Sequence, residues 1–181
     1  MDDGQSNVYI GREAGKGSGT GNNATNHVII GYQAGTSIST GDGNVLLGYQ
    51  AGDAITTKTG IIAIGLGAAG AISTTGDYTI AIGYGAMGGA EIGDGNIAIG
   101  YQSMQNANAS GLHRNTTLGY QTMANVGSNS AQDNTTIGYQ AGQDATSAVH
   151  NTLVGSKAGH NLTTGDYNTI IGSDAAGANA G

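Results

Sequence analysis

Four residue types are missing from this chain of 181 residues: cysteine, proline, tryptophan and phenylalanine. Without cysteine there is neither disulfide stapling nor thiol chemistry, and the redox compartment cannot be read from the sequence. Without phenylalanine and tryptophan the chain cannot build the bulky aromatic core of an ordinary globular domain of this length. The absence of proline alongside 35 glycines excludes collagen. Because large aromatic side chains are missing, any core that this chain forms must be thin.

Charge is also sparse. Charged residues make up 9% of the chain, and 12 acidic against 5 basic side chains give a net charge of −7. This balance argues against a nucleic-acid or anionic-membrane partner. No apolar run approaches the length of a membrane span, and residues 1–5 do not resemble the start of a classical signal peptide.

A short motif recurs along the whole chain: a β-branched residue, any residue, an aliphatic residue and a glycine, which we term the marker glycine. Successive marker glycines are 17 to 20 residues apart. They are Gly11, Gly31, Gly48, Gly65, Gly83, Gly100, Gly119, Gly138, Gly155 and Gly172. Such a period is typical of solenoids, so we expect residues 1–181 to form a single repeat domain of ten repeats.

The motif suits a short β-strand, and we expect an all-β, left-handed parallel β-roll of about ten rungs. We assign the residue before each marker glycine to a core ladder: Ile10, Ile30, Leu47, Ile64, Ile82, Ile99, Leu118, Ile137, Val154 and Ile171. The residue between the two aliphatic positions points to the opposite face, which is not polar either. We expect that second face to pack against other chains in a homotrimer. Its interface candidates are Ala63, Ala81, Ala98, Thr117 and Thr136.

The remainder of each repeat predicts turns. Gly-rich blocks such as Tyr32-Gln33-Ala34-Gly35 follow the marker glycine. An apolar residue often stands seven positions after it, which we interpret as a second, shorter strand. The residues concerned are Ile38, Ile55, Ile72, Ala90, Ala107, Val126, Ala145 and Leu162. A polar turn of the Gly, Asp and Asn kind, such as residues 40–44, then closes the rung.

Three segments of the chain resemble known repeats. The segment Asn96-Ile97-Ala98-Ile99-Gly100 is similar to the head repeats of YadA-type trimeric adhesins, and residues 134–142 and 162–172 resemble repeats of bacteriophage tail fibres. The resemblance implies a left-handed parallel β-roll with three chains side by side that serves attachment or acts as a stalk. It also implies a virion or extracellular surface filament as the location. The YadA-type repeat is shorter, and no coiled-coil stalk is visible here.

Two polar columns are expected to stack. Asparagine stands four residues before most marker glycines, where its amide could hydrogen-bond from rung to rung. Tyrosine often follows the glycine directly, and this stripe either contacts a cell-surface glycan or receptor or covers the edge of a thin core. Its members are Tyr32, Tyr49, Tyr84, Tyr101, Tyr120 and Tyr139.

Alternatives from other classes remain open. Residues 30–35 also fit the hexapeptide pattern of left-handed β-helices, which would make an acyltransferase with a histidine base conceivable. Repeats such as Gly43-Asn44-Val45-Leu46-Leu47-Gly48 resemble plant ice-binding β-rolls, and a threonine array could order water. For that array we consider Thr116, Thr135, Thr152 and Thr169.

Classical catalytic chemistry finds little support in the spacing. The aspartates of the turns lack the spacing of calcium-binding nonapeptide rolls, and Gly65 to Gly70 matches a dinucleotide motif only through the glycine excess. We therefore expect no enzyme activity, no cofactor and no metal, and a structural fibre or filament subunit. Joining Gly181 of one copy to Met1 of the next would place 20 residues between markers, so we expect head-to-tail stacking into filaments.

Overall fold

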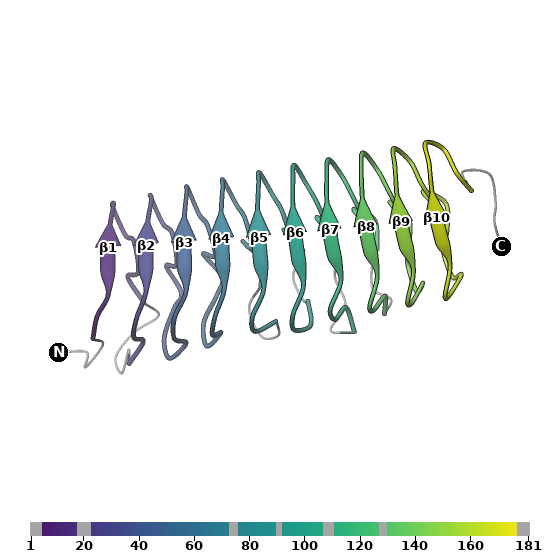
Figure 1. Ribbon diagram of the computed structural model, residues 1–181. Coiled ribbons are helices and arrows are strands. Elements are labelled where there is room, and N and C mark those ends of the chain that lie inside the picture. Colours follow the sequence, from purple (N-terminus) through teal and green to yellow (C-terminus); the bar gives the residue numbers. More distant parts are fainter. Residues whose placement is uncertain are drawn as a thin grey trace.

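The computed structural model describes residues 5–17, 23–72, 76–89, 92–106, 111–126 and 130–176. Ten three-residue strands pair in chain order into one parallel sheet (Figure 1). They are β1 (Val8–Ile10), β2 (Val28–Ile30), β3 (Val45–Leu47), β4 (Ile62–Ile64), β5 (Ile80–Ile82), β6 (Ile97–Ile99), β7 (Thr116–Leu118), β8 (Thr135–Ile137), β9 (Thr152–Val154) and β10 (Thr169–Ile171). The described part of the chain contains no helix. The expected parallel β-solenoid is confirmed, with about nine turns between the first strand and the last.

Each strand pairs with the next in the register that the repeat predicts. Val28 lies beside Val45, Ile29 beside Leu46, and Ile30 beside Leu47. Backbone hydrogen bonds continue past the strand ends, as from Gly48 N to Ile30 O at 2.9 Å. Figure 1 shows the connecting segments of every rung crossing behind the sheet, so that the molecule is a rod.

The marker glycines form a column at the corner where each strand ends. Their φ angles lie between +123° and +143°, a region open to glycine but not to other residues. Stacking adds a second constraint, since a Cβ on Gly65 would lie 2.6 Å from the carbonyl oxygen of Gly83 in the next rung. Both the backbone conformation and the close approach of successive rungs therefore require glycine here.

The interior of the rod lies on the opposite side of each strand from the one predicted. The middle residues of β2 to β9 are almost fully buried: Ile29, Leu46, Ala63, Ala81, Ala98, Thr117, Thr136 and Leu153. The expected trimer-interface residues Ala63, Ala81, Ala98, Thr117 and Thr136 thus belong to the core of a single chain. The ten residues assigned to the core ladder, from Ile10 to Ile171, point outward instead and are half-buried or exposed. The prediction was wrong because both faces are apolar, so alternation alone could not tell inside from outside.

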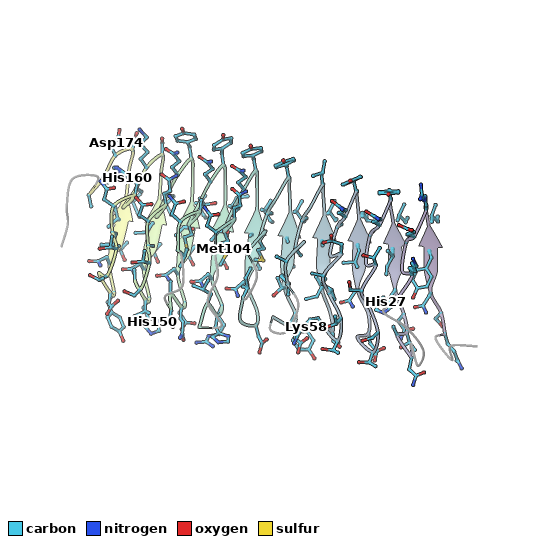
Figure 2. All side chains as sticks on the ribbon, turned by 180° about the vertical axis from the view of Figure 1, so that it is seen from behind. His27, Lys58, Met104, His150, His160 and Asp174 are labelled. Atoms are coloured by element: carbon cyan, nitrogen blue, oxygen red, sulfur yellow. The ribbon has the colours of Figure 1, made fainter. Side chains whose placement is uncertain are left out.

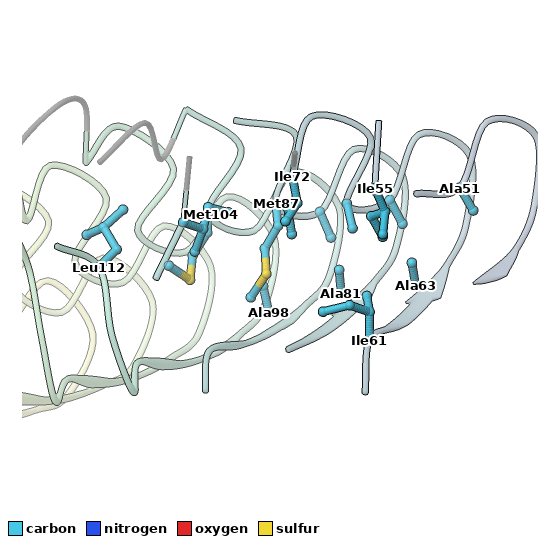
Figure 3. Packing of buried hydrophobic residues seen from close by; sticks show 14 of the residues in the cluster. Ala51, Ile55, Ile61, Ala63, Ile72, Ala81, Met87, Ala98, Met104 and Leu112 are labelled. Atoms are coloured by element: carbon cyan, nitrogen blue, oxygen red, sulfur yellow. The ribbon is translucent and has the colours of Figure 1, made fainter. Parts of the chain in front are cut away.

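The small size of the middle residues has a local cause. Where β5, β6 and β7 carry Ala81, Ala98 and Thr117, the fourth position after the marker glycine is Met87, Met104 or Met123, and all six side chains are fully buried. Where the strands carry Ile29 and Leu46, that position is Gly35 or Gly52. A Cβ on Gly35 would lie 2.9 Å from the terminal carbons of both Ile29 and Leu46. In these five rungs the space is therefore filled by one large side chain, from the strand or from the turn. Figure 3 shows two of the turn methionines, Met87 and Met104, in the core with the strand alanines Ala81 and Ala98.

The expected second strand is absent from the described residues, although its apolar positions are where the sequence suggested. Ile38, Ile55, Ile72, Val126, Ala145 and Leu162 are buried in the core but lie in turns and irregular backbone. Ala90 and Ala107 fall outside the described residues. The rung returns through tight turns in which non-glycine residues such as Gln50 and Met104 adopt positive φ angles, and no regular strand spacing can form across them.

The marker column yields a first prediction. We expect Gly65→Ala to destabilise the rod strongly, because the new methyl group would meet the Gly83 carbonyl oxygen. Gly67→Ala is the matched control, since Gly67 has a φ of +61° but no atom within 4 Å of the place that a methyl group would take. Its cost should be only about 1 kcal/mol. Urea unfolding of both variants measures the difference, and equal losses would contradict the stacking constraint.

The shared core volume yields a second prediction. Ala98→Leu should cost about 1 to 3 kcal/mol of unfolding free energy by overpacking. Met104→Gly should cost about 2 to 5 kcal/mol by leaving a cavity. The double variant Ala98→Leu with Met104→Gly should be clearly more stable than the sum of the two losses, because the leucine enters the space that the methionine leaves. A double-mutant cycle by chemical denaturation measures this coupling, and additive effects would show that the two side chains do not share a space.

Candidate functional site

The outer side of the ten-stranded sheet is uncharged over its whole length, and the last residue of every strand is isoleucine, leucine or valine. Two columns of side chains point outward, one from the first and one from the last residue of each strand, and we call their twenty residues the apolar sheet face. None of the twenty is charged. At the two ends of the rod the side chains are the most open, with 56% of Ile10 and 69% of Ile171 exposed. Between them most members are half-buried by their neighbours within the sheet.

The composition of the apolar sheet face changes along the rod. In β1 to β6 the first residue of each strand is valine or isoleucine, whereas in β7 to β10 it is threonine. Thr116, Thr135 and Thr152 are half-buried and Thr169 is exposed, and all four belong to the outward column. Because the first residue of each strand points outward, these threonines lie on the surface of the single chain rather than in its core.

A second surface feature runs along one long edge of the rod. The six tyrosines of the predicted stripe directly follow their marker glycines and lie outside the core, and we call them the tyrosine ridge: Tyr32, Tyr49, Tyr84, Tyr101, Tyr120 and Tyr139. Figure 2 shows a row of ring side chains on the edge where Asp174 lies, with Lys58 and His150 on the opposite edge. Five of the six are 40 to 50% exposed, so the ridge does not serve mainly to cover the core.

The rings of the tyrosine ridge stack on one another in two groups. Tyr32 and Tyr49 have ring centroids 5.4 Å apart. After an interruption at Leu66, the rings of Tyr84 and Tyr101 are 5.3 Å apart, and the next two pairs are 4.8 and 5.5 Å apart. At one end the guanidinium carbon of Arg12 lies 5.6 Å from the centre of the Tyr32 ring.

This stacking limits what the ridge can bind. A sugar that stacks on tyrosine needs a free ring face, and within each group the faces are occupied by neighbouring rings. Free faces are left only at the ends of a group, such as beside Leu66. The glutamines next to the tyrosines are also paired, as in the hydrogen bond from Gln121 Nε2 to Gln102 Oε1 at 2.9 Å. The ridge therefore presents mainly ring edges and phenol groups.

The opposite, turn edge of the rod carries a column of aspartates. Asp42, Asp77, Asp94 and Asp166 each accept a hydrogen bond from a backbone N–H of the preceding rung, as from Thr25 N to Asp42 Oδ1 at 3.0 Å. The bonds from Thr25 also lower the pKa of Asp42. These aspartates thus hold turns together, as the turn composition indicated. Within the described ranges no three His, Asp or Glu side chains are grouped so that they could hold a metal ion.

A charged and aromatic row extends along the same edge in the second half of the chain. Arg114 makes two hydrogen bonds to the carboxylate of Asp133, at 2.7 and 2.8 Å, and this contact lowers the pKa of Asp133. The next residue in the column, His150, stacks on Tyr167 with ring centroids 4.8 Å apart. No sequence pattern pointed to this row, because its residues differ from one repeat to the next.

The predicted asparagine column forms a hydrogen-bonded ladder inside the rod. Asn115, Asn134, Asn151 and Asn168 each donate their backbone N–H and side-chain amide to the Oδ1 of the preceding asparagine. The expectation of bonding from rung to rung is confirmed. Because both amide groups have partners, these polar side chains can be buried without the usual cost.

One rung of this ladder holds a histidine in place of asparagine. His27 is fully buried, and its Nδ1 accepts the backbone N–H of Asn44 at 3.0 Å, as an asparagine oxygen does elsewhere. Burial lowers the pKa of His27, although the nearby Asp42 carboxylate acts in the opposite direction. At the turn edge, Nδ1 of His113 likewise accepts a backbone N–H from a neighbouring rung, that of Asp94 at 3.0 Å.

Comparison with known proteins identifies no relative of this chain. The chain matches no protein-family model, no curated protein and no solved structure. No described helix is long and apolar enough to cross a membrane. The class defined by the structure is thus a parallel β-solenoid of repeated coils of about 17 residues.

His27 gives a prediction for the pH dependence of stability. The unfolded chain takes up a proton at His27 near the ordinary histidine pKa of 6.5, whereas the folded chain resists it, because a protonated Nδ1 would face the Asn44 N–H. The free energy of unfolding should therefore fall as the pH drops below 6.5. His27→Asn, which restores the ladder residue, should flatten the curve down to about pH 5, where carboxylates are still ionised. Thermal melts at successive pH values test this, and identical curves would exclude His27 as the cause.

Proposed function

We propose that this protein is a structural fibre or filament subunit that serves attachment and has no catalytic role. The observation that best supports this proposal is the apolar sheet face, whose twenty outward positions contain no charged residue. An exposed apolar surface that runs the length of a rod is typical of an interaction site. A second copy of the same chain suits it, because the strands repeat at the same spacing in both partners.

The proposed assembly is a homotrimer, with the apolar sheet faces turned toward one another. This keeps the expected side-by-side association but reverses the side that takes part, since the interface candidates expected from the sequence are core residues. Ile82 and Ile99 lie near the middle of the face, half-buried within their own sheet. Contact with other copies would bury their remaining apolar surface, at about 25 cal/mol per Å². Charges lie on the turns and edges, away from the interface.

We further propose that these rods stack head to tail. Asn168 donates its backbone and side-chain N–H groups to Asn151, which leaves its Oδ1 for an asparagine in a following rung. Asn7 of a second copy supplies such a residue, and β1 of that copy would pair with β10. The exposed Val8, Ile10 and Ile171 side chains would then continue the outward columns without interruption. The contact joins unlike surfaces, so it does not close and builds a filament.

The location that suits such a filament is a virion or an extracellular surface. Its attachment partner would be a cell-surface glycan or receptor at the tyrosine ridge. The ring faces of Tyr49 and Tyr84 beside Leu66 are positions where a sugar could stack, whereas Arg12 covers the outer face of Tyr32.

Ice binding is the second candidate, favoured by the outward threonines of β7 to β10. Their register in a parallel sheet gives a regular array of hydroxyl and methyl groups on the outer surface. Isoleucine, leucine or valine fills the neighbouring outward column of the same strands. A monomer that shows thermal hysteresis, lost on replacing Thr135 with lysine, would favour this function over the fibre.

The fibre proposal is tested by placing a charge on the apolar sheet face. Ile82→Lys should abolish lateral association, because a lysine would be buried in the interface without a partner, whereas the monomer should still fold since residue 82 points outward. Leu66→Lys is the control: this leucine is 47% exposed but lies on the edge that carries the tyrosine ridge.

Analytical ultracentrifugation and electron micrographs provide the readout. The unchanged protein and Leu66→Lys should form trimers and end-to-end filaments, and Ile82→Lys should sediment as a folded monomer. A monomeric unchanged protein at high concentration, or an Ile82→Lys variant that still forms trimers, would overturn the proposal.

A further inference from the structure

The tyrosine ridge gathers most of the tyrosines of this protein in one exposed row. The chain has no cysteine and no tryptophan, which are the side chains that usually react first with one-electron oxidants. Met87, Met104 and Met123 are fully buried in the core. An oxidising equivalent that reaches the described surface therefore meets tyrosine, and six of the nine tyrosines of the chain lie in this one row.

We propose that the tyrosine ridge is a site of oxidative modification, at which dityrosine bonds join successive rungs of the rod. The oxidant is of the one-electron class, such as a peroxidase supplied with hydrogen peroxide. The modification goes beyond the proposed fibre function and does not depend on it, because both partner rings come from the same chain.

The chemistry balances with two tyrosines and one molecule of peroxide. Each phenol loses one electron and one proton to the oxidant and becomes a phenoxyl radical. The two radicals couple through the ring carbons ortho to oxygen, which forms one carbon–carbon bond. The two ortho hydrogens then move to the phenol oxygens as the rings regain aromaticity. Over the whole step two hydrogen atoms leave the protein, and the peroxide is reduced to two molecules of water.

The geometry brings the reacting rings together before oxidation. Within the longer group the ring planes are inclined by 11°, 12° and 24°, with centroids at most 5.5 Å apart. The backbones that carry them are one strand spacing apart, about 4.8 Å, so each ring has its partner in the adjacent rung. Exposure of 40 to 50% leaves the rings room to turn toward each other. Radical pairs thus form as neighbours and need no encounter between molecules.

The protein also contains its own controls. Leu66 interrupts the ridge, so Tyr49 and Tyr84 lie two rungs apart and should not couple. Tyr78 and Tyr167 lie off the ridge and are 69% and 77% exposed, more than any ridge tyrosine. If exposure alone governed the reaction, these two would be the first to cross-link, in bonds between molecules.

The experiment treats the full chain with peroxidase and a limiting amount of hydrogen peroxide at low protein concentration. Dityrosine fluorescence and mass spectrometry of proteolytic peptides identify the bonded pairs. We expect bonds between neighbours on the ridge, namely Tyr32 with Tyr49, Tyr84 with Tyr101, Tyr101 with Tyr120 and Tyr120 with Tyr139. Their yield per chain should not change when the protein is diluted tenfold.

Two variants sharpen the outcome. Tyr101→Phe keeps a stacked ring but removes the phenol, so the two bonds that involve residue 101 should disappear while the Tyr32 with Tyr49 bond persists. Leu66→Tyr should add bonds to Tyr49 and to Tyr84, joining the two groups. Bonds mainly through Tyr78 or Tyr167, a yield that falls with dilution, or no new bond in Leu66→Tyr would each overturn the proposal.

Discussion

The close approach of successive rungs at the marker glycine column governs the architecture. At Gly65 the next rung's carbonyl oxygen occupies the place that a side chain would need, so the residue after each strand must be the one without a Cβ. Once the backbone is fixed there, parallel hydrogen bonds hold each rung one strand spacing from the next. Each residue then meets its equivalent in the neighbouring repeat. The columns of asparagine, glutamine, tyrosine and aspartate all follow from this constant register between neighbouring rungs.

The interior has little volume, and strand and turn divide it between them. Ala98 on a strand is matched by Met104 in the following turn, whereas Leu46 is matched by Gly52. In the rungs that show it, such compensation lets the sequence differ while the strand spacing stays constant. It also explains how a chain without phenylalanine or tryptophan fills a core: methionine and the aliphatic residues reach the same space from different positions of the rung.

Sequence reasoning predicted the strands, their register and the asparagine ladder, because each of these repeats with the period of the marker glycine. It inverted the two faces, since both are apolar and the alternation of side chains along a strand does not tell which one is buried. The buried alanines could be recognised only with the methionines six residues further on, as for Ala98 and Met104. The row of Arg114, Asp133 and His150 was missed because no residue type recurs in it. Stacking of the tyrosines needed the side-chain geometry itself.

The direction of the asparagine ladder gives the rod a chemical polarity. From Asn115 to Asn168, every hydrogen bond between ladder asparagines is donated toward the lower-numbered rung. The aspartate column of the turns runs in the opposite sense, with Thr25 donating to Asp42 of the following rung. One end of any such column thus offers acceptors where the other offers donors. Like ends of two rods are therefore not complementary. A filament built from such rods would be polar, with two chemically different ends.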